Sequence, residues 1–529
     1  MKKRIAREWI LFAAGIISVC TLPPVSQAQG NQTGPQSDGE KARIARIENG
    51  IEPVHLTKGE PPVRLSLEKL MSLHDAPGLS VAVIKDYKIA WTKAYGVTDP
   101  GGQTPVTTET LFQAGSISKP VAATAMLKMV EQGKLSLDED VNLKLKEWKV
   151  PENEFTKDQK VTLRRLASHT AGLTVHGFPG YDTEERLPTI VQVLDGEKPA
   201  NTAPVRVEFP PGSKFQYSGG GVTIEQLLMT EVSRKPFPAL LKETVFDKIG
   251  MKDSSYEQPL PKTWSSRTPT GTDASGKAIH GRWHIYPEMA AAGLWTTPTD
   301  LAKFAIEIAL SRQGKSNRVL NQQTVQEMLT PVKEGSGLGL FLPEDRPGEF
   351  GHYGADEGFQ AVLMMNADTG DGFVAMSNSD NGINLAEEYM RAVRKEYGWM
   401  YRDAMPRSSG QEMMLLAKLR GVDAALKKYE EAKSLGDPKK TPDEYVLNSI
   451  GNYFLKSAKI DDAIKVFEKN VQEHPDSSEV YASLADAYAA AGKKKSAKEN
   501  YEKSLKIDPK NRHARDELGK LVSEHDRKK

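Results

Sequence analysis

Residues 115–120 read Gly-Ser-Ile-Ser-Lys-Pro, which places the hydroxyl of Ser116 three residues before the amine of Lys119. Because a helix turns once in about 3.6 residues, a helix that begins at Ser116 would carry both side chains on one face. A buried lysine can lose its charge and act as a base. The helix amino terminus also directs N–H groups toward Ser116, where negative charge develops during attack on a carbonyl. The stretch predicts acyl transfer, but this spacing is also common on exposed helices and needs support from the rest of the chain.

The size of the chain indicates more than one domain. Its 529 residues exceed what one hydrophobic core usually supports, so we expect one large and one small domain. The formal net charge of +1 favours neither nucleic acid nor an anionic membrane as a partner. No group of His, Cys, Asp and Glu has the spacing of metal ligands, so we expect no metal and no cofactor.

The amino terminus has the parts of a bacterial-type secretory signal. Basic residues within 2–7 precede an apolar run at 9–22, and Ser26-Gln27-Ala28 forms a small-x-small cleavage site. The run is shorter than the roughly 20 residues that span a bilayer, which favours cleavage after Ala28 over a retained anchor. The single cysteine, Cys20, lies in this segment, so the mature protein would have no disulfide. We therefore expect residues 1–28 to be a signal peptide and the protein to be periplasmic or secreted.

The order of strand and helix patterns indicates an α+β fold. Residues 29–60 are polar and are expected to form a linker. Apolar runs at 79–84 and 88–95 predict two strands, and those at 358–366 and 373–378 predict an antiparallel hairpin. Helical patterns lie between these strands, so distant segments are expected to meet in one domain.

Four further motifs follow the S-x-x-K stretch in order. They are Ser168-His169-Thr170-Ala171-Gly172-Leu173, Pro211-Gly212 before Tyr217-Ser218, Gly293-Leu294 with Asp300-Leu301, and His352-x-Gly354. Together the five motifs resemble the serine β-lactamase and penicillin-binding protein superfamily, in the class C-like branch that includes esterases and D-aminopeptidases. The resemblance covers residues 61–398 and implies an antiparallel sheet flanked by helices, with an additional helical domain.

The resemblance also implies roles for individual residues. Ser116 would be the nucleophile, and Lys119 with Tyr217 would remove its proton and return it. The backbone N–H groups of Ser116 and Ala355 would form the oxyanion hole.

Two positions depart from the true β-lactamases. His352 of His352-x-Gly354, which would line the substrate site, stands in place of the lysine of the K-T-G motif and removes a fixed cation. Gly219 stands where the Tyr-x-Asn motif has an asparagine that holds the substrate amide, which glycine cannot do. Both changes favour an ester or a D-peptide over efficient hydrolysis of penicillins or cephalosporins. The absence of G-x-S-x-G around Ser116 excludes the α/β-hydrolase type.

Other polar residues near the motifs are interpreted as structural. Ser118 faces away from Ser116 on the predicted helix, and His169 is interpreted as a packed or turn-stabilising residue. His284, Tyr286 and Glu288 are interpreted as packing or surface residues. The alternatives are that all three line the pocket and that Glu288 is a base for deacylation.

A second domain is predicted at residues 411–526, where a repeat has a period of 34 residues. The matching pairs are Ile450 and Leu484, Phe454 and Tyr488, Ala463 and Ala497, Phe467 and Tyr501, and Pro475 and Pro509. They resemble tetratricopeptide repeats, with a degenerate earlier unit near Ala425 and Tyr429 and a final capping helix at 511–524. Such repeats imply a protein partner or self-association, and the alternative is an appendage that only stabilises the large domain.

The sequence thus predicts an exported serine hydrolase that forms an acyl-Ser116 intermediate on an ester, amide or lactam. Its partners would be a small acyl donor or peptide substrate and a protein, with no nucleic acid and no membrane-spanning segment after signal cleavage. The alternative is a catalytically weak binding or scaffold protein of the same fold. Gly219 supports this alternative, whereas intact Ser116, Lys119 and Tyr217 count against it.

Overall fold

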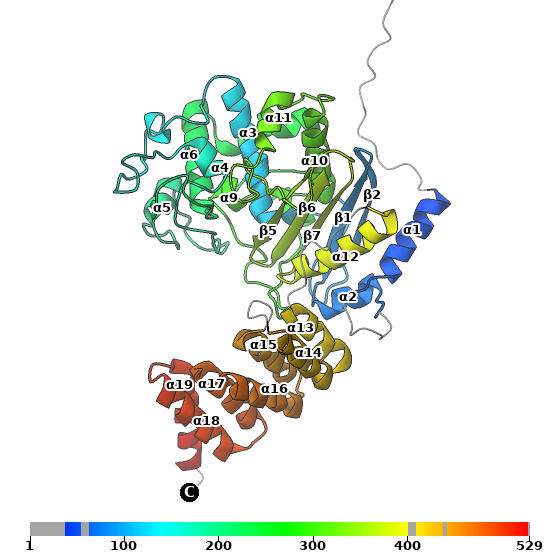
Figure 1. Cartoon of the computed structure of the whole chain (residues 1–529), viewed down its shortest axis with the longest axis vertical. Helices are drawn as coiled ribbons and strands as arrows, with labels where there is room; N and C mark the ends of the chain where they lie inside the picture. Colours follow the sequence, from blue (N-terminus) through cyan, green and yellow to red (C-terminus); the bar gives the residue numbers. More distant parts are fainter. Residues whose placement is uncertain (1–36, 54–62, 400–408, 437–441, 527–529) are drawn as a thin grey trace, which may run out of the picture.

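The computed structural model describes residues 37–53, 63–399, 409–436 and 442–526. The predicted signal peptide, residues 1–28, lies outside the described residues. Within the described ranges, no helix is both long and apolar enough to cross a membrane. The chain forms a large domain of helices and strands, and a stack of helices follows at its carboxyl end (Figure 1).

The main sheet of the large domain has five antiparallel strands in the order β2-β1-β7-β6-β5. The strands are β1 (Gly78–Lys85), β2 (Lys88–Gly96), β5 (Glu349–Asp356), β6 (Phe359–Asn366) and β7 (Gly372–Ser377). β1 pairs with β7, so the two ends of the domain meet in one sheet, as the α+β interpretation predicts. A separate two-stranded sheet consists of β3 (Phe112–Gln113) and β4 (Trp295–Thr296).

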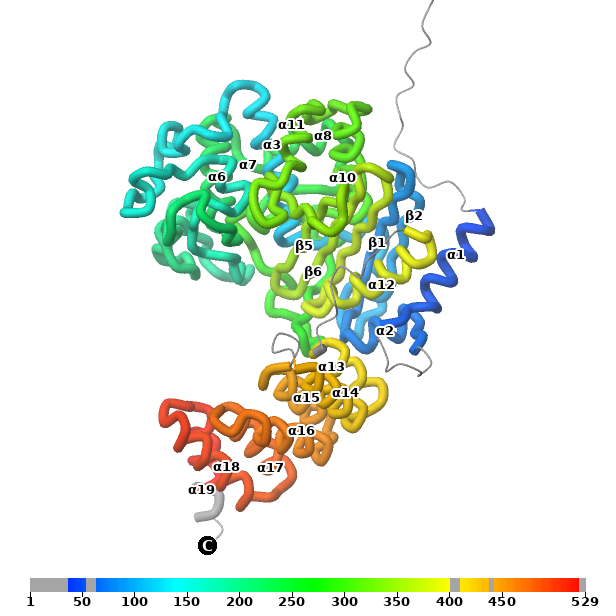
Figure 2. The backbone as a smooth tube through the Cα atoms, in the orientation of Figure 1, coloured from blue at the N-terminus to red at the C-terminus, as the bar shows by residue number. Residues whose placement is uncertain are grey.

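Helices cover both faces of the main sheet. Alternate residues of each strand point to opposite sides, so each strand supplies side chains to the helices on both faces. Val81 and Val83 pack in a cluster with α12 (Gly382–Tyr397). Ala82 and Ile84 belong to the other cluster, which includes residues of α10 (Pro298–Arg312). The helical part of the large domain extends from the α10 side, as the course of the chain shows (Figure 2). Its other helices are α3 (Ser118–Glu131), α4 (Leu163–Ala167), α5 (Ile190–Asp195), α6 (Gly219–Ser233), α7 (Phe237–Leu241), α8 (Asp247–Ile249), α9 (Met289–Ala292) and α11 (Gln322–Met328).

The segment predicted as a linker, residues 29–60, is in part a structured element. Its described residues include α1 (Asp38–Asn49), which packs against α12 near α2 (Leu67–Leu73). Ile44 and Ile47 lie on one face of α1 and are buried in the cluster with α12. The linker prediction is therefore wrong for residues 38–51. A few apolar residues at helical spacing are enough to bury one face of this segment, although most of its residues are polar.

The carboxyl-terminal helices stack as antiparallel pairs. They are α13 (Ser409–Arg420), α14 (Val422–Ser434), α15 (Glu444–Lys456), α16 (Ile460–Glu473), α17 (Ser478–Ala490), α18 (Lys494–Ile507) and α19 (Arg512–Asp526). Ala463 and Ala497, one period apart, are both fully buried, and so are Phe467 and Tyr501. The 34-residue period therefore marks the positions where paired helices interlock.

α13 joins the repeats to the large domain. Leu415 and Leu416 of α13 are buried in the same cluster as α12. The Lys418 ammonium donates to the Leu73 carbonyl and to the Asp75 carboxylate. A cavity of about 330 Å³ lies at this junction and is lined by residues of both parts, including His74.

Candidate active site

Ser116 lies on a single 3₁₀ turn, Gly115–Ile117, between β3 and the start of α3 at Ser118. The sequence predicted a helix from Ser116; the structure has this tighter turn first. Gly115 has φ of +50°, and a Cβ atom there would lie 2.4 Å from the Ala355 nitrogen of β5. Only glycine therefore allows β5 to approach the turn that carries the hydroxyl.

Lys119 is buried in the first turn of α3, and its Nζ lies 2.8 Å from the Ser116 Oγ. The same Nζ donates to the Ala291 carbonyl of α9, also at 2.8 Å. Gln226 of α6 holds α9 in place, since its amide donates to the Pro287 carbonyl (3.0 Å) and accepts from the Ala290 N–H (2.8 Å). The amine is thus oriented by backbone on one side and by the serine on the other.

Ser118 is fully buried and has a structural position. Its hydroxyl donates to the Gly115 carbonyl (2.6 Å) and accepts from the Leu294 N–H (3.0 Å). These bonds tie the turn with Ser116 to the segment that links α9 and β4.

Tyr217 stands on the loop before α6, and its ring centroid lies 5.0 Å from Lys119 Nζ. The ring is tilted against His169, with centroids 4.3 Å apart, and stacks on Phe341 at 6.1 Å. The Nδ1–H of His176 donates to the Tyr217 carbonyl at 2.6 Å. The structure therefore brings Tyr217 beside Lys119 and Ser116, three residues that lie on two distant segments.

The two histidines whose rings pack against the Tyr217 ring, His169 and His352, are uncharged. Burial and the positive charge of Lys119 lower the pKa of His352 to about 3. Because a carbonyl can only accept, the 2.5 Å contact of His352 Nδ1 with the Tyr353 carbonyl requires the proton on Nδ1. Burial and Lys119 also hold the pKa of His169 well below its usual range, and its Nδ1 accepts from the Ser218 N–H. His352 thus brings an imidazole without positive charge to this part of the site.

β5 carries Ala355 and Gly354 past the serine turn. A Cβ atom on Gly354 would lie 1.9 Å from the Ala114 carbonyl oxygen, so a side chain there would push the strand away. Ala355 is exposed, and β5 is an edge strand of the sheet. The strand therefore presents its backbone next to Ser116, where the predicted oxyanion hole requires an N–H group.

Three carboxyl groups are buried near the site: Glu225, Glu288 and Asp356. Burial raises the pKa of Glu225 to about 8 and that of Glu288 to about 7, and raises the pKa of Asp356 well above its usual range. The carboxyl oxygens of Glu288 and Asp356 are shielded from solvent and have no hydrogen bond of good geometry among the described residues. Glu288 is therefore a buried residue and not a surface one, and its role in deacylation stays a prediction.

His284 and Tyr286 form hydrogen bonds with backbone groups of other segments. His284 Nδ1–H donates to the Pro179 carbonyl at 2.8 Å. Tyr286 is buried, and its hydroxyl accepts from the Glu357 N–H at 3.0 Å.

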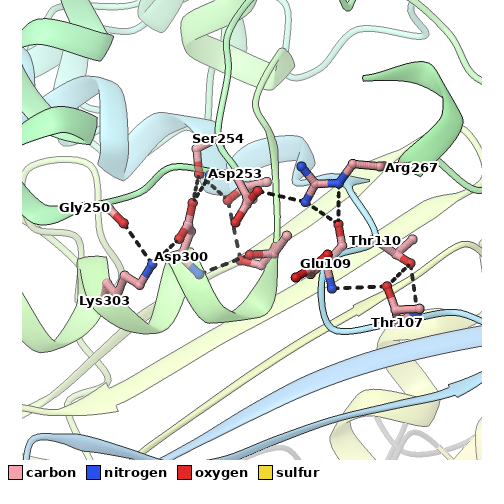
Figure 3. A network of polar contacts seen from close by, with 11 residues as sticks. Thr107, Glu109, Thr110, Gly250, Asp253, Ser254, Arg267, Asp300 and Lys303 are labelled. Carbon is pink, nitrogen blue, oxygen red and sulfur yellow. Dashed lines mark hydrogen bonds and ion pairs between the residues drawn. The ribbon is translucent and has the colours of Figure 1, made fainter. Parts of the chain in front are cut away.

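Asp300 of the Asp300-Leu301 motif anchors α10 (Figure 3). Its buried carboxylate accepts from the Asp253 N–H (2.7 Å), the Ser254 hydroxyl (2.9 Å) and the Lys303 ammonium (2.7 Å). Arg267 extends the network by an ion pair with the Asp253 carboxylate at 2.8 Å. The motif therefore fixes the start of α10, which follows directly after β4.

Sequence reasoning missed Ala291 and Gln226, which position Lys119. No spacing or motif connects them with residues 116–119, because the contact is made across 172 residues of chain. Among the residues with described placement, no group of three or more His, Cys, Asp or Glu has a geometry that could hold a metal ion.

Comparison with known proteins finds matches to both parts of the chain. Residues 64–396 match the beta-lactamase family model, and residues 454–521 match a tetratricopeptide repeat model. The chain is 29% identical over 242 residues to a beta-lactamase from Pseudomonas fluorescens. The aligned region covers 45% of this chain and 62% of that protein. The chain is also 26% identical over 340 residues to penicillin-binding protein 4 from Amycolatopsis lactamdurans. That alignment covers 60% of this chain and 84% of that protein.

A solved structure has the same fold. The octameric penicillin-binding protein homologue from Pyrococcus abyssi superimposes with a TM-score of 0.53 at 22% identity, over 63% of this chain and 77% of that chain. The match to the Pseudomonas fluorescens protein spans less than two thirds of that protein's length. Because the family model covers more than half of the sequence, this chain belongs to the beta-lactamase family and carries tetratricopeptide repeats after that domain.

Proposed function

We propose that this protein is an exported serine hydrolase that transfers the acyl group of an ester or amide first to Ser116 and then to water. The observation that carries the proposal is the 2.8 Å contact between Lys119 Nζ and Ser116 Oγ. A serine hydroxyl is a weak nucleophile unless a neighbouring base takes its proton, and a base must lie within hydrogen-bond distance to do so.

The proposed reaction has two halves. The Ser116 oxygen bonds to the substrate carbonyl carbon while its proton passes to the Lys119–Tyr217 pair. The N–H groups of Ser116 and Ala355 stabilise the oxyanion. The bond to the leaving group then breaks, and that group receives the proton. Water attacks the acyl-Ser116 ester in the same way and releases the acid.

Esters and D-peptides are the proposed substrates, ahead of penicillins and cephalosporins. His352 is uncharged, so it offers no cation for the carboxylate of a β-lactam. Gly219 has no side chain to hold a substrate amide. Both features weaken binding of donors that need these contacts and leave the acyl-transfer groups intact.

The test is hydrolysis of p-nitrophenyl acetate by residues 29–529, with intact mass recorded during turnover. Ser116→Ala removes the nucleophile, and Ser434→Ala, on an exposed serine at the end of α14, serves as the matched control. We expect the wild type and Ser434→Ala to turn over and to gain one acetyl group. Ser116→Ala should do neither, with a loss of about 1,000-fold or more in kcat.

The second candidate is a binding or scaffold protein of the same fold, and Gly219 favours it. If the wild type and Ser116→Ala are equally inert and unacylated, this candidate replaces the first.

We also propose that the repeats at 411–526 bind a protein partner or a second copy of the chain. Stacked helix pairs of this type form extended concave surfaces suited to that use. Sedimentation of the full chain over a range of concentrations tests self-association. A single monomeric species at all concentrations would leave a separate partner as the proposal.

A further inference from the structure

The space beside Gly219, two residues after Tyr217, is filled by an aromatic ring. A Cβ atom on Gly219 would lie 2.9 Å from the Cε2 of Phe178 and 3.2 Å from the His176 carbonyl oxygen. Phe178 is half-buried and packs against the main hydrophobic cluster of the domain. A side chain at residue 219 would therefore require the ring of Phe178 to move from its present position.

The backbone at the start of α6 offers no free donor in place of a side chain. The Gly219 N–H donates to the His176 carbonyl (3.1 Å) and the Gly220 N–H donates to the Val175 carbonyl (3.0 Å). The Gly221 N–H donates to the Ser218 hydroxyl (3.0 Å). Although a helix amino terminus usually attracts anions, the first N–H groups of α6 are already occupied.

Phe178 is held in place from both sides. Before it, the Nδ1–H of His176 donates to the Tyr217 carbonyl. After it, the Pro179 carbonyl accepts from His284. The loop that carries Phe178 is thus anchored to the loop with Tyr217 and to the segment before α9.

The surroundings of Tyr217 are aromatic and have little charge. The rings of His169, Phe341 and His352 contact Tyr217, and both histidines are neutral. The Lys119 Nζ is close to them, and it already contacts Ser116 and the Ala291 carbonyl. A substrate group next to Tyr217 therefore meets aromatic carbon instead of a side-chain amide or an unpaired ammonium group.

We propose that Phe178 determines the acyl specificity of this site, because it fills the space beside Gly219 and selects neutral esters with an apolar acyl chain. The inference rests on the proposed function and narrows its substrates from esters and D-peptides to neutral esters. A donor that carries an amide or a carboxylate next to the scissile carbonyl loses its hydrogen bonds with water when it binds. It finds no hydrogen-bond partner at Phe178 or at the aromatic rings around Tyr217.

The test compares p-nitrophenyl acetate with p-nitrophenyl butyrate in the wild type, Phe178→Leu and Phe178→Ala. We expect the wild type to prefer butyrate. Phe178→Ala should lose about tenfold in kcat/KM for butyrate through KM and little for acetate, and Phe178→Leu should keep most of the preference. Phe155→Ala, which changes a phenylalanine equally half-buried against the same cluster, is the matched control and should leave the ratio unchanged.

A double variant tests the exclusion directly. Phe178→Ala makes room for Gly219→Asn, so the pair should be acylated by benzylpenicillin at least about tenfold faster than either single variant, measured by intact mass. Two results would overturn the inference and leave the proposed function standing. One is an equal loss of kcat/KM for acetate and butyrate in Phe178→Ala, and the other is equal use of benzylpenicillin and p-nitrophenyl butyrate by the wild type. Absence of Ser116-dependent acylation by any donor would overturn both.

Discussion

The contacts that hold the site join residues far apart in the chain, whereas those that hold the repeats join near neighbours. Lys119 contacts Ala291 across 172 residues, and Ser118 contacts Leu294 across 176. In the repeats, Asn470 donates to the Glu444 carbonyl across 26 residues. A change in the site should therefore disturb several segments together, while a change in the repeats should stay within a unit and its neighbours.

The largest effect is expected at Gly354. A methyl group there would lie 1.9 Å from the Ala114 carbonyl oxygen, which is backbone and cannot rotate away. Gly354→Ala should lower the free energy of unfolding of the large domain by about 3 kcal/mol or more and abolish ester turnover. Urea denaturation followed by ester turnover and by circular dichroism measures both effects.

Gly519 of α19 is the control in the repeats. A Cβ atom on Gly519 would have no atom within 4 Å, so Gly519→Ala should stabilise the repeat region by about 0.5–1 kcal/mol without changing turnover. If Gly354→Ala instead keeps native stability and turnover, β5 can move away from the serine turn at little cost, and the site is less constrained than the contacts indicate.

The next effect concerns the pH dependence of stability. Burial, opposed by Lys119, raises the pKa of Glu225 to about 8 from an ordinary value of 4.5. Between these values the folded state holds more protons than the unfolded state, so the free energy of unfolding falls as pH rises. Glu225→Gln removes this dependence and should gain on the order of 2–4 kcal/mol over the wild type between pH 5 and pH 8. Denaturation at both pH values measures the gap.

Glu473 in the repeats should behave with the opposite sign. Hydrogen bonds from Lys433 and Lys469 lower the pKa of this carboxyl, so its contribution is present above pH 4.5 and is lost on acidification. Because these ion pairs are partly exposed, Glu473→Gln should cost less than about 1 kcal/mol at pH 7 and nothing below the lowered pKa. For Glu225, the difference in free energy of unfolding between Glu225→Gln and the wild type should grow with pH. If it does not, the Glu225 carboxyl is better hydrated than its burial implies.

Sequence reasoning succeeded where the signal is local. Ser116 and Lys119 are three residues apart, and that spacing alone placed the amine within reach of the hydroxyl. The repeats were found because Ala463 and Ala497 occupy equivalent buried positions one period apart. Short apolar runs also located β1 and β2 within one residue at each end.

The partners of the site were not predictable in the same way. Phe178 reaches Gly219 through a loop without any periodic pattern, and Ala291 acts through its carbonyl, which every residue has. The α1 helix was hidden because its polar face dominates the composition of residues 38–49. The catalytic roles of Ser116 and Tyr217 stay predictions until turnover is measured.

The smallest effect is expected at Tyr501. Its ring is buried and its hydroxyl donates to the Asp486 carboxylate at 2.5 Å. Asp486 also accepts from His513 Nε2 at 2.9 Å and so keeps a partner when the hydroxyl is removed. Tyr501→Phe should therefore cost about 0.5–1 kcal/mol in unfolding of the repeats.

The repeat itself supports this small value, because Phe467 occupies the equivalent position one unit earlier and is equally buried. Ester turnover by Tyr501→Phe should equal that of the wild type, since the contact lies within the last repeats, beyond the junction with α13. A change in turnover larger than the error of the assay would show that strain passes from α18 through the stack to the large domain. The repeats would then act on the site, and the difference between local and long-range contacts would no longer separate the two regions.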